Sequence, residues 1–464
     1  MKKSLSLLFA GLACFSLVSL ASCTTTQNDE TTLNIVCLNK GYGRAWIDEI
    51  AAKWVEQNPG YKINLTAESD APNIIDAHLS SRNNIDDLYI SVGTSWRTYA
   101  ASGKLLALDD LLEETVDGVK VKDKVSSEYS NSIYYNDHSY RLPWTSGIGG
   151  IYYNHAMFEQ YGWEIPTTYT ELATLVETIK TANKPVPGSR SDVVKPFIYT
   201  GQNTDYFDYT VFTWWGQLAG QDAIQDFLKY ESAENFDASK SATYAKLKEA
   251  TQLWDNLFQP GNYVTGSANM NNHQAQQSFL NGYAAMMFNS DWLYNEMLGY
   301  TDNNVLPETF DLRLMKTPVV NNAVDPNASY IVGEDQYIAI PKTTIKADLA
   351  KSFIKLMISD YGCQTFLKNS NALLAYDFDI DSYQTDNEYV KSLLNYKKTC
   401  TTTYTNFSNN TMYLAGVIDI WGKGAYRPFE NIVNSRSATV ESAFTRIADE
   451  VKRNWDSWRR EAGL

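Results

Sequence analysis

The residues with the clearest chemical potential are aromatic and polar side chains that follow predicted β-strands. Lys40 and Tyr42 follow an apolar run at 33–38, and Asp291 and Trp292 follow a second one. A flat aromatic surface beside hydrogen-bond donors and acceptors suits a ligand with one apolar face and a rim of hydroxyls, such as a sugar ring. The pattern therefore predicts reversible binding of a small polar molecule.

Further candidates have an aromatic face or a hydrogen-bonding group in a predicted loop. They are Thr94, Ser95, Trp96, Trp144, Ser146, Trp214, Glu334, Trp421 and Arg427. A place in the core is the alternative interpretation for each tryptophan, and a solvated loop is the alternative for Asp291 and Glu334. Arg427 could bind a hydroxyl or carboxylate through two hydrogen bonds, or could form a structural ion pair instead.

The sequence offers little support for metal or covalent chemistry. Its four histidines show no HExxH spacing, its cysteines show no CxxC spacing, and no G-x-S-x-G turn is present. We therefore expect no metal, no cofactor and no catalytic residue. An exported glycoside hydrolase remains an alternative, because it also combines aromatic rings with carboxylates, although it needs two positioned carboxyl groups. A structural or adhesive lipoprotein is a second alternative, but no internal repeat supports it.

The first 23 residues resemble a bacterial lipoprotein signal. Lys2 and Lys3 precede an apolar run at 5–20, and Leu20-Ala21-Ser22-Cys23 ends it. The resemblance implies a signal peptide at 1–22, removal before Cys23 and diacylglycerol on its sulfur, so that the protein is exported and anchored to a membrane at its extracytoplasmic side. An ordinary secretory leader is the alternative. Residues 23–32 form a predicted tether, since 24–32 have no apolar side chain.

Charge and cysteine content narrow the class of partner. The formal net charge is −15, and no basic block interrupts the chain, so nucleic acid is excluded as a partner and neutral or cationic ligands are favoured.

Outside the leader the cysteines are Cys37, Cys363 and Cys400. Cys37 lies in an apolar run and is predicted to be a buried thiol. A disulfide between Cys363 and Cys400 is left as an alternative.

The periodicity of apolar residues predicts an α/β protein. Strands are expected at 33–38, 61–65 and 88–92, with helices at 46–55 and 96–102 between and after them. This alternation is typical of an open parallel sheet covered by helices, in which ligands bind beyond the carboxyl ends of the strands. Those ends correspond to the loops at 39–43 and 93–96.

The remainder of the chain predicts a second unit. Arg141 to Asn154 contains three glycines and a proline and is expected to cross between two lobes. Thr168 and Glu171 form a predicted capping box for a following helix. Later elements are a helix at 242–258, a strand at 337–341 and a helix at 347–358. The chain from residue 33 onward is also longer than one hydrophobic core usually supports, which favours two lobes.

In this order the motifs resemble the extracellular solute-binding proteins of ABC importers, in the carbohydrate-binding group related to the maltose-binding protein. The resemblance is carried by Lys40-Gly-Tyr42, by residues 99–108, by the crossing at 142–154, and most specifically by residues 275–292, which end in Asn-Ser-Asp-Trp292. It covers essentially all of 33–371, and the last ninety or so residues more weakly.

The resemblance implies a two-lobed α/β fold of the periplasmic-binding-protein type, class II, with open, mostly parallel sheets, helices on both faces and several hinge crossings. It implies lobe 1 at 33–143 and 317–360, and lobe 2 at 144–316 and 361–464. The expected function is capture of a sugar by hinge closure and delivery to the transmembrane subunits of an ABC permease, with no enzyme activity and a monomeric chain.

The resemblance also assigns roles to single residues. Trp292 matches a position that stacks on sugar, and Lys40 matches one that hydrogen-bonds hydroxyls. Thr94 and Ser95 stand where the related proteins have a carboxylate and a basic residue, so specificity for maltose does not follow. A cationic or peptide-like solute is the alternative ligand, favoured by the acidic charge of the chain.

Overall fold

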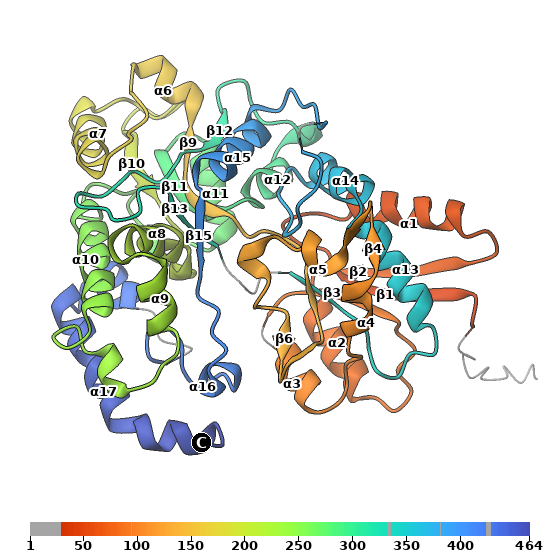
Figure 1. Ribbon diagram of the computed structural model, residues 1–464. Coiled ribbons are helices and arrows are strands. Elements are labelled where there is room, and N and C mark those ends of the chain that lie inside the picture. Colours follow the sequence, from red (N-terminus) through yellow and green to blue (C-terminus); the bar gives the residue numbers. More distant parts are fainter. Residues whose placement is uncertain (1–28, 94, 332–335, 381, 424–427) are drawn as a thin grey trace, which may run out of the picture.

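The structure is a computed structural model that describes residues 29–93, 95–331, 336–380, 382–423 and 428–464. Two lobes lie side by side, each with its own sheet (Figure 1). This confirms the predicted α/β class with two lobes. Within the described residues, none of the helices combines the length and the apolar character that crossing a membrane requires.

The first lobe is built on a five-stranded sheet. Its strand order is β2 (Lys62–Glu68), β1 (Thr32–Leu38), β3 (Leu88–Ser91), β14 (Tyr337–Ala339) and β8 (Leu142–Pro143). Its helices are α1 (Ala45–Gln57), α2 (Ala71–Ser80), α3 (Ser95–Ala101), α4 (Asp109–Glu113), α5 (Val121–Lys124), α13 (Ala347–Met357) and α14 (Asp360–Ser370). The helix α1 forms as its apolar spacing predicts, with Trp46, Ile50 and Trp54 buried on one face.

The second lobe contains a four-stranded sheet ordered β10 (Lys195–Ile198), β11 (Ala284–Ser290), β9 (Gly149–Asn154) and β12 (Leu312–Leu314). A two-stranded sheet of β13 (Ala328–Ile331) and β15 (Thr402–Thr405) packs against α8. The helices are α6 (His155–Tyr161), α7 (Tyr169–Ala182), α8 (Asp208–Ala219), α9 (Gln221–Phe227), α10 (Ala242–Leu257), α11 (Asn272–Leu280), α12 (Leu293–Leu298), α15 (Glu388–Thr399), α16 (Thr411–Leu414) and α17 (Val440–Glu461).

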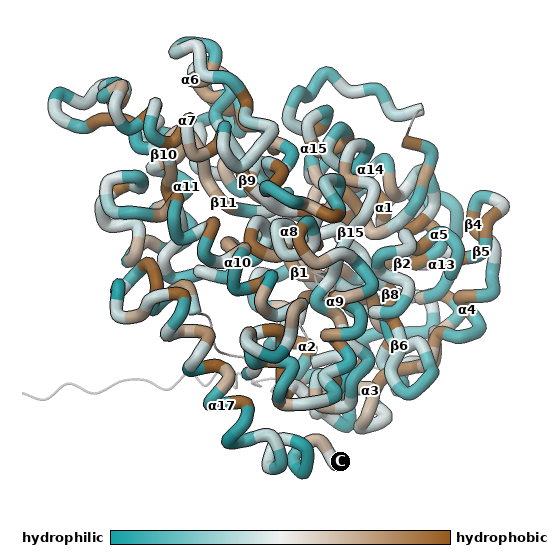
Figure 2. Tube along the Cα trace, turned by 60° about the vertical axis from the view of Figure 1, so that its left-hand side comes forward, coloured by the Kyte–Doolittle hydropathy of each residue, from teal (hydrophilic) through white to brown (hydrophobic). Residues whose placement is uncertain are grey.

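Local signals in the second lobe act as the sequence predicts. The capping box before α7 is present, with the Glu171 amide donating to Thr168 Oγ1 at 3.2 Å. The long α17 alternates hydrophilic and hydrophobic residues along its length (Figure 2), and Phe444, Ile447 and Val451 are buried on one face. Its apolar stripe packs on α10 and on residues 233–236.

The strand directions differ from the predicted mostly parallel sheets. The pairs β1–β2 and β1–β3 are parallel, whereas β14 runs antiparallel to both β3 and β8. In the second sheet β9 runs antiparallel to β11 and β12. Strands β9 and β14 begin after chain crossings between the lobes and not after a covering helix, so the right-handed crossover that makes neighbours parallel does not apply to them.

Among the described residues, three parts of the chain that connect the lobes contact one another at the hinge. Isolated bridges join Thr145 to Leu374 and Ile148 to Ile331. We predicted the last departure from lobe 1 after residue 360, but α14 packs against α1, and Phe366 lies 5.3 Å from Trp46 between ring centroids. The third crossing therefore follows α14. The cysteines Cys37, Cys363 and Cys400 are free and buried, so Cys363 and Cys400 are not bridged.

Candidate functional site

A cavity of about 190 Å³, called here the Trp292 cavity, lies where loops of both lobes meet. The first lobe contributes side chains from the carboxyl ends of β1 and β3 and from the start of β14, and the second lobe contributes residues before α8 and around α11 and α12. The lining residues are Leu38, Lys40, Gly41, Tyr42, Val92 and Gln336 from the first lobe, and Tyr206, Asn272, Trp292 and Glu296 from the second.

The aromatic surface of the cavity comes mainly from the second lobe. Trp292 lies two residues after the end of β11 and immediately before α12, so the end of a buried strand fixes its position. The Tyr206 ring lies 6.1 Å from the Trp292 ring at an interplanar angle of 50°, and the Tyr42 ring meets Trp292 edge-on at 6.1 Å. A flat indole face bordered by two phenols can contact the apolar face of a sugar ring.

The first lobe approaches this surface through a glycine. A Cβ atom added to Gly41 would lie 2.7 Å from the Cβ of Trp292, so a larger residue would push the two lobes apart. The carbonyl of Gly41 accepts a hydrogen bond from the Asn295 side chain at 2.9 Å. The loop after β1 is therefore held against the start of α12 by backbone contact, and Lys40 beside it is exposed at the rim.

Glu296 supplies a carboxyl group to the cavity. It accepts a hydrogen bond from Gln276 Nε2 at 2.6 Å, and Tyr300 donates to the same glutamine at 2.9 Å. Burial raises the pKa of Glu296, while the Gln276 hydrogen bond and the charge of Lys40 oppose that shift. The carboxyl group is thus held in place on one side and can accept hydroxyl hydrogen bonds on the other.

Two further acceptors in the cavity wall have no hydrogen bond among the described residues. They are the buried atoms Asn272 Oδ1 and Gln336 Oε1. Asn272 is held in place because its Nδ2 donates to the Tyr206 hydroxyl at 3.2 Å. A buried acceptor without a donor costs free energy, so these two oxygens indicate positions where a ligand would donate.

Asp291, predicted to contact a ligand, lies instead at the hinge. It is 0% exposed, and its carboxylate accepts from the Tyr42 hydroxyl at 2.9 Å, the Ser146 hydroxyl at 3.2 Å and the Leu373 amide at 3.1 Å. Its carbonyl accepts from the Tyr389 hydroxyl at 2.7 Å. Asp291 and Ser146 therefore join the first lobe and two crossings, because a buried carboxylate needs several donors.

Four predicted tryptophans are core residues, which corrects their assignment to the cleft. Trp96, Trp144 and Trp214 are 0% exposed and Trp421 is 2% exposed. Trp144 packs at 5.1 Å from the Trp46 ring, Trp214 donates to the Pro318 carbonyl, and Trp421 stacks on Phe212. Each indole has a large apolar surface, and packing against other core residues removes that surface from water.

The remaining predicted residues are placed as follows. Ser95 is exposed at the start of α3 and does not line the Trp292 cavity. Thr94, Glu334, Arg427 and the proposed lipidation site Cys23 lie outside the described residues. The structure thus brings Lys40, Tyr42 and Trp292 together in one cavity. The other described candidates do not line it, although Asp291 accepts a hydrogen bond from Tyr42.

Sequence reasoning missed Tyr206, Asn272, Glu296 and Gln336. For Glu296 a signal was present, because it lies four residues after Trp292 and residues at that spacing share a helix face. Tyr206 and Asn272 come from separate segments that only the fold brings to α12, and no local pattern marks them.

The chain matches one known family over most of its length. A family model described as bacterial extracellular solute-binding protein matches residues 40–362. The chain belongs to this family. The matched span includes every described residue of the Trp292 cavity except Leu38.

Sequence and structure comparisons agree with this membership. The solute-binding protein is 22% identical over 291 residues to the multiple sugar-binding protein of Streptococcus mutans, an alignment that covers 61% of this chain and 63% of that relative, which is less than two thirds of its length. Among solved structures, a chitin oligosaccharide binding protein matches with a TM-score of 0.65 at 17% identity, covering 93% of this chain and 99% of its own. RafE in complex with raffinose matches with a TM-score of 0.64 at 16% identity, covering 90% and 98%. At these identities the structural likeness establishes the two-lobed fold.

Proposed function

We propose that this solute-binding protein is the receptor of an ABC importer and captures a sugar between its two lobes. The observation that carries the proposal is the Trp292 cavity, where an indole face lies beside one carboxyl group and two buried acceptors without donors. A sugar ring offers an apolar face for the indole and hydroxyl donors for these oxygens. The printed names of the relatives, which bind multiple sugars, chitin oligosaccharide or raffinose, support the same ligand class.

The working motion in this proposal is hinge closure. The ligand contacts loops of both lobes at once, so it binds the closed state more tightly and shifts the population toward that state. The membrane permease then distinguishes the closed from the open receptor. Cys23 carries the lipid that holds the receptor near the permease, and residues 24–32 serve as the tether.

A cationic or peptide-like solute is the second candidate, and Glu296 favours it. A carboxylate beside the Trp292 indole and two phenols is also the combination that binds an ammonium group, through ion pairing and contact with aromatic faces. The formal net charge of −15 would attract such a solute.

A thermal-shift screen of residues 24–464 separates the candidates. Monosaccharides, oligosaccharides, polyols, polyamines and short peptides are each added to the protein. A ligand at a hundredfold excess over its Kd stabilises the native state by about 2.7 kcal/mol. We expect a sugar to raise the midpoint by several degrees and to be recovered unaltered. If only a polyamine raises the midpoint, the ligand is a cationic solute and not a sugar. Consumption of a sugar would contradict a binding function.

A further inference from the structure

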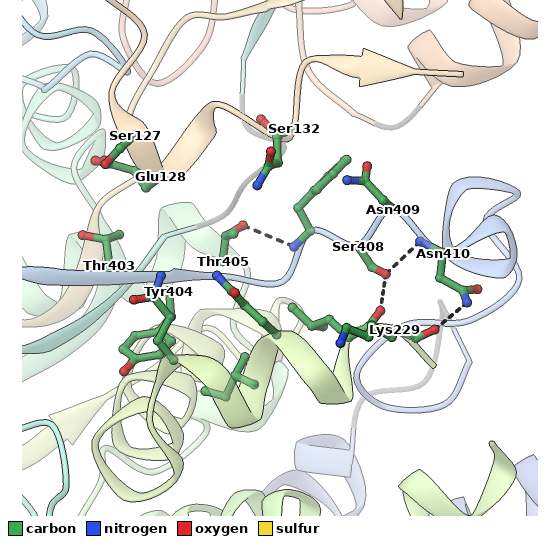
Figure 3. Close-up of a pocket in the computed structure, with 16 residues that line it drawn as sticks. Ser127, Glu128, Ser132, Lys229, Thr403, Tyr404, Thr405, Ser408, Asn409 and Asn410 are labelled. Carbon is green, nitrogen blue, oxygen red and sulfur yellow. Dashed lines mark hydrogen bonds between the residues drawn. The ribbon is translucent and has the colours of Figure 1, made fainter. Parts of the chain in front are cut away.

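A second and larger cavity between the lobes lies away from the Trp292 cavity. It measures about 490 Å³ and is called here the amide groove (Figure 3). Its first-lobe wall is the segment 127–132, and its second-lobe wall combines α9 with the end of β15 and the residues after it. The lining residues are Ser127, Glu128, Asn131, Ser132, Gln221, Ile224, Gln225, Leu228, Lys229, Thr403, Tyr404, Thr405, Phe407, Ser408, Asn409 and Asn410.

Hydroxyl and amide side chains dominate the chemistry of this groove. Its two charged side chains have opposite signs. Lys229 donates to Asp226, outside the lining, at 2.6 Å, and Glu128 in the first-lobe wall accepts a hydrogen bond from Ser127 at 3.4 Å. A site for an anion or a cation would present an excess of one charge. A wall of neutral groups that both donate and accept matches an uncharged, hydroxyl-rich molecule.

Four amides of the groove make no hydrogen bond within the described protein. They are Asn131 from the first lobe, Gln221 and Gln225 from α9, and Asn409 from the segment after β15. All four are exposed, so water satisfies them when no ligand is present. Because they come from both lobes, a ligand that binds them bridges the lobes as a ligand in the Trp292 cavity does.

The support beneath these amides is fixed by hydrogen bonds. The Ser408 hydroxyl donates to the Leu228 carbonyl, and the Asn410 side chain donates to the Lys229 carbonyl at 2.6 Å (Figure 3). The Asn410 amide donates to Ser408 Oγ at 3.1 Å. The loop carrying Asn409 is therefore tied to the end of α9, and Gln225 and Asn409 are presented on one framework.

The amide groove and the Trp292 cavity lie along the same edge of the first sheet. The Trp292 cavity touches the ends of β1 and β3 and the start of β14. The segment 127–132 is fastened next to β8, because the Ser132 carbonyl accepts from Arg141 and the Ser146 carbonyl accepts from Tyr129. In this sheet β8 is the third neighbour of β1, which corresponds to about 14 Å at the usual strand spacing. One sugar ring cannot span that distance, but a short chain of rings can.

We infer that the amide groove holds the distal rings of an uncharged oligosaccharide whose terminal ring occupies the Trp292 cavity. This inference rests on the proposed function and narrows its ligand class from sugars in general to oligosaccharides. Glu128 excludes acidic sugars from the distal positions by charge repulsion.

The test measures affinity as a function of chain length. Xylo-, chito- and malto-oligosaccharides, each as a ladder from one ring to six, are titrated calorimetrically into the full mature chain. We expect the affinity in one ladder to rise steeply once the chain is long enough to reach the groove. The double variant Gln225→Ala with Asn409→Ala should bind the longest sugar of that ladder about tenfold more weakly, since it lacks two neutral hydrogen bonds, and should bind the shortest sugar unchanged. Asn131→Ala tests the opposite wall in the same way.

The control is Gln57→Ala, which removes an equally exposed amide at the end of α1, outside the groove. Its affinities should equal those of the unmodified protein for every length. The inference is overturned if monosaccharide and hexasaccharide bind equally, or if the groove variants bind the long sugar normally, and in both cases the proposed function stands. Binding of no carbohydrate at all would overturn both. If a peptide binds tightly and the groove variants abolish that binding, the amide groove is a peptide site and not an oligosaccharide site.

Discussion

The Trp292 cavity and the hinge are neighbouring regions with similar residues but opposite roles. At the hinge, Trp144 and Asp291 are both 0% exposed, and the Asp291 carboxylate accepts three hydrogen bonds from the protein itself. In the cavity, Trp292 is only partly buried, and oxygens of Asn272 and Gln336 have no donor within the described residues. Both regions combine tryptophan with a carboxylate and amides or hydroxyls.

The comparison shows that composition does not identify a binding site. What distinguishes the two regions is the open space beside the unpaired atoms. The Trp144 Nε1 also has no partner among the described residues, but Trp144 is fully enclosed, whereas Asn272 and Gln336 line a cavity beside a partly exposed ring. A buried group with all its partners stabilises the fold, whereas a buried acceptor without a donor is stabilised only when a ligand arrives. Asp291 and Trp292 are adjacent in sequence and fall on opposite sides of this division.

The largest effect is expected for Trp144→Ala. Removal of a fully buried indole that packs on Trp46 and Phe366 should lower the free energy of unfolding by about 3 to 5 kcal/mol, as measured by urea denaturation. Trp144→Phe, which keeps most of the ring contact, should lose less. Normal stability with lost sugar binding would place Trp144 at the ligand and would remove the distinction between hinge and cavity.

Asp291→Ala should destabilise the fold by about 3 kcal/mol, since three donors lose their acceptor at roughly 1 kcal/mol each. Tyr42→Phe removes one of those donors and should cost about a third as much. Denaturation curves for both variants give the ratio directly. If Asp291→Ala unfolds like the unmodified protein but no longer binds ligand, the carboxylate contacts the ligand and not the hinge.

Trp292→Ala should weaken sugar binding by roughly 1 to 3 kcal/mol, the scale for burying a large apolar side chain. This corresponds to about a five- to 150-fold rise in Kd. The unfolding midpoint of the free protein should fall less than in Trp144→Ala, because Trp292 is partly exposed. Titration calorimetry with Trp292→Phe as the conservative control tests stacking. Unchanged affinity in Trp292→Ala would show that the ring supports structure alone.

Glu296→Gln tests the role of the cavity carboxyl group through the pH dependence of folding stability. Because burial raises the pKa of Glu296 in the folded state, the folded protein holds this proton more tightly than the unfolded chain does. Stability from this group is present below the ordinary glutamate pKa and is lost as the pH rises through the raised value. At neutral pH the glutamine variant should therefore be more stable than the unmodified protein, and this advantage should vanish as the pH falls below the ordinary glutamate pKa.

The same variant should bind sugar more weakly at neutral pH, since an amide oxygen accepts hydroxyl hydrogen bonds less strongly than a carboxylate. Gln276 still finds an acceptor in the new side chain, so the local structure is kept. Thermal midpoints and affinities between pH 4 and pH 8 provide both readouts. A stability difference independent of pH would show that Glu296 does not titrate between the folded and unfolded states.

Much of the fold could be predicted from local patterns. The strand β1 and the helix α1 form within a few residues of their predicted bounds, and α7 begins at its predicted capping box, because each depends on side-chain periodicity or on a capping pair a few residues apart. The directions of β9 and β14 were not predictable in the same way. They depend on where the chain crosses between lobes, which no local pattern records.

The residues of the candidate site also fall into predictable and unpredictable groups. Lys40, Tyr42 and Trp292 could be found because each lies within four residues of the carboxyl end of a strand, where ligands bind in open α/β sheets. The two strands belong to different sheets, so their meeting in one cavity depends on the arrangement of the lobes. Tyr206, Asn272 and Gln336 could not, because they approach Trp292 from segments distant in sequence. The buried tryptophans were equally unpredictable, since a tryptophan in a loop and one in a core look identical in sequence.

The sequence by itself therefore determined the family, the two-lobed α/β class and the position of Trp292, because these depend on ordered local motifs. Only the tertiary structure decided that Asp291 joins the segments at the hinge, that Tyr206 and Asn272 enter the cavity and that an amide groove spans both lobes. Each of these depends on contacts that folding makes between segments far apart in the chain, such as Tyr42 and Ser146 with Asp291 or Tyr206 with Trp292. That pairing is set by packing and not by spacing along the sequence.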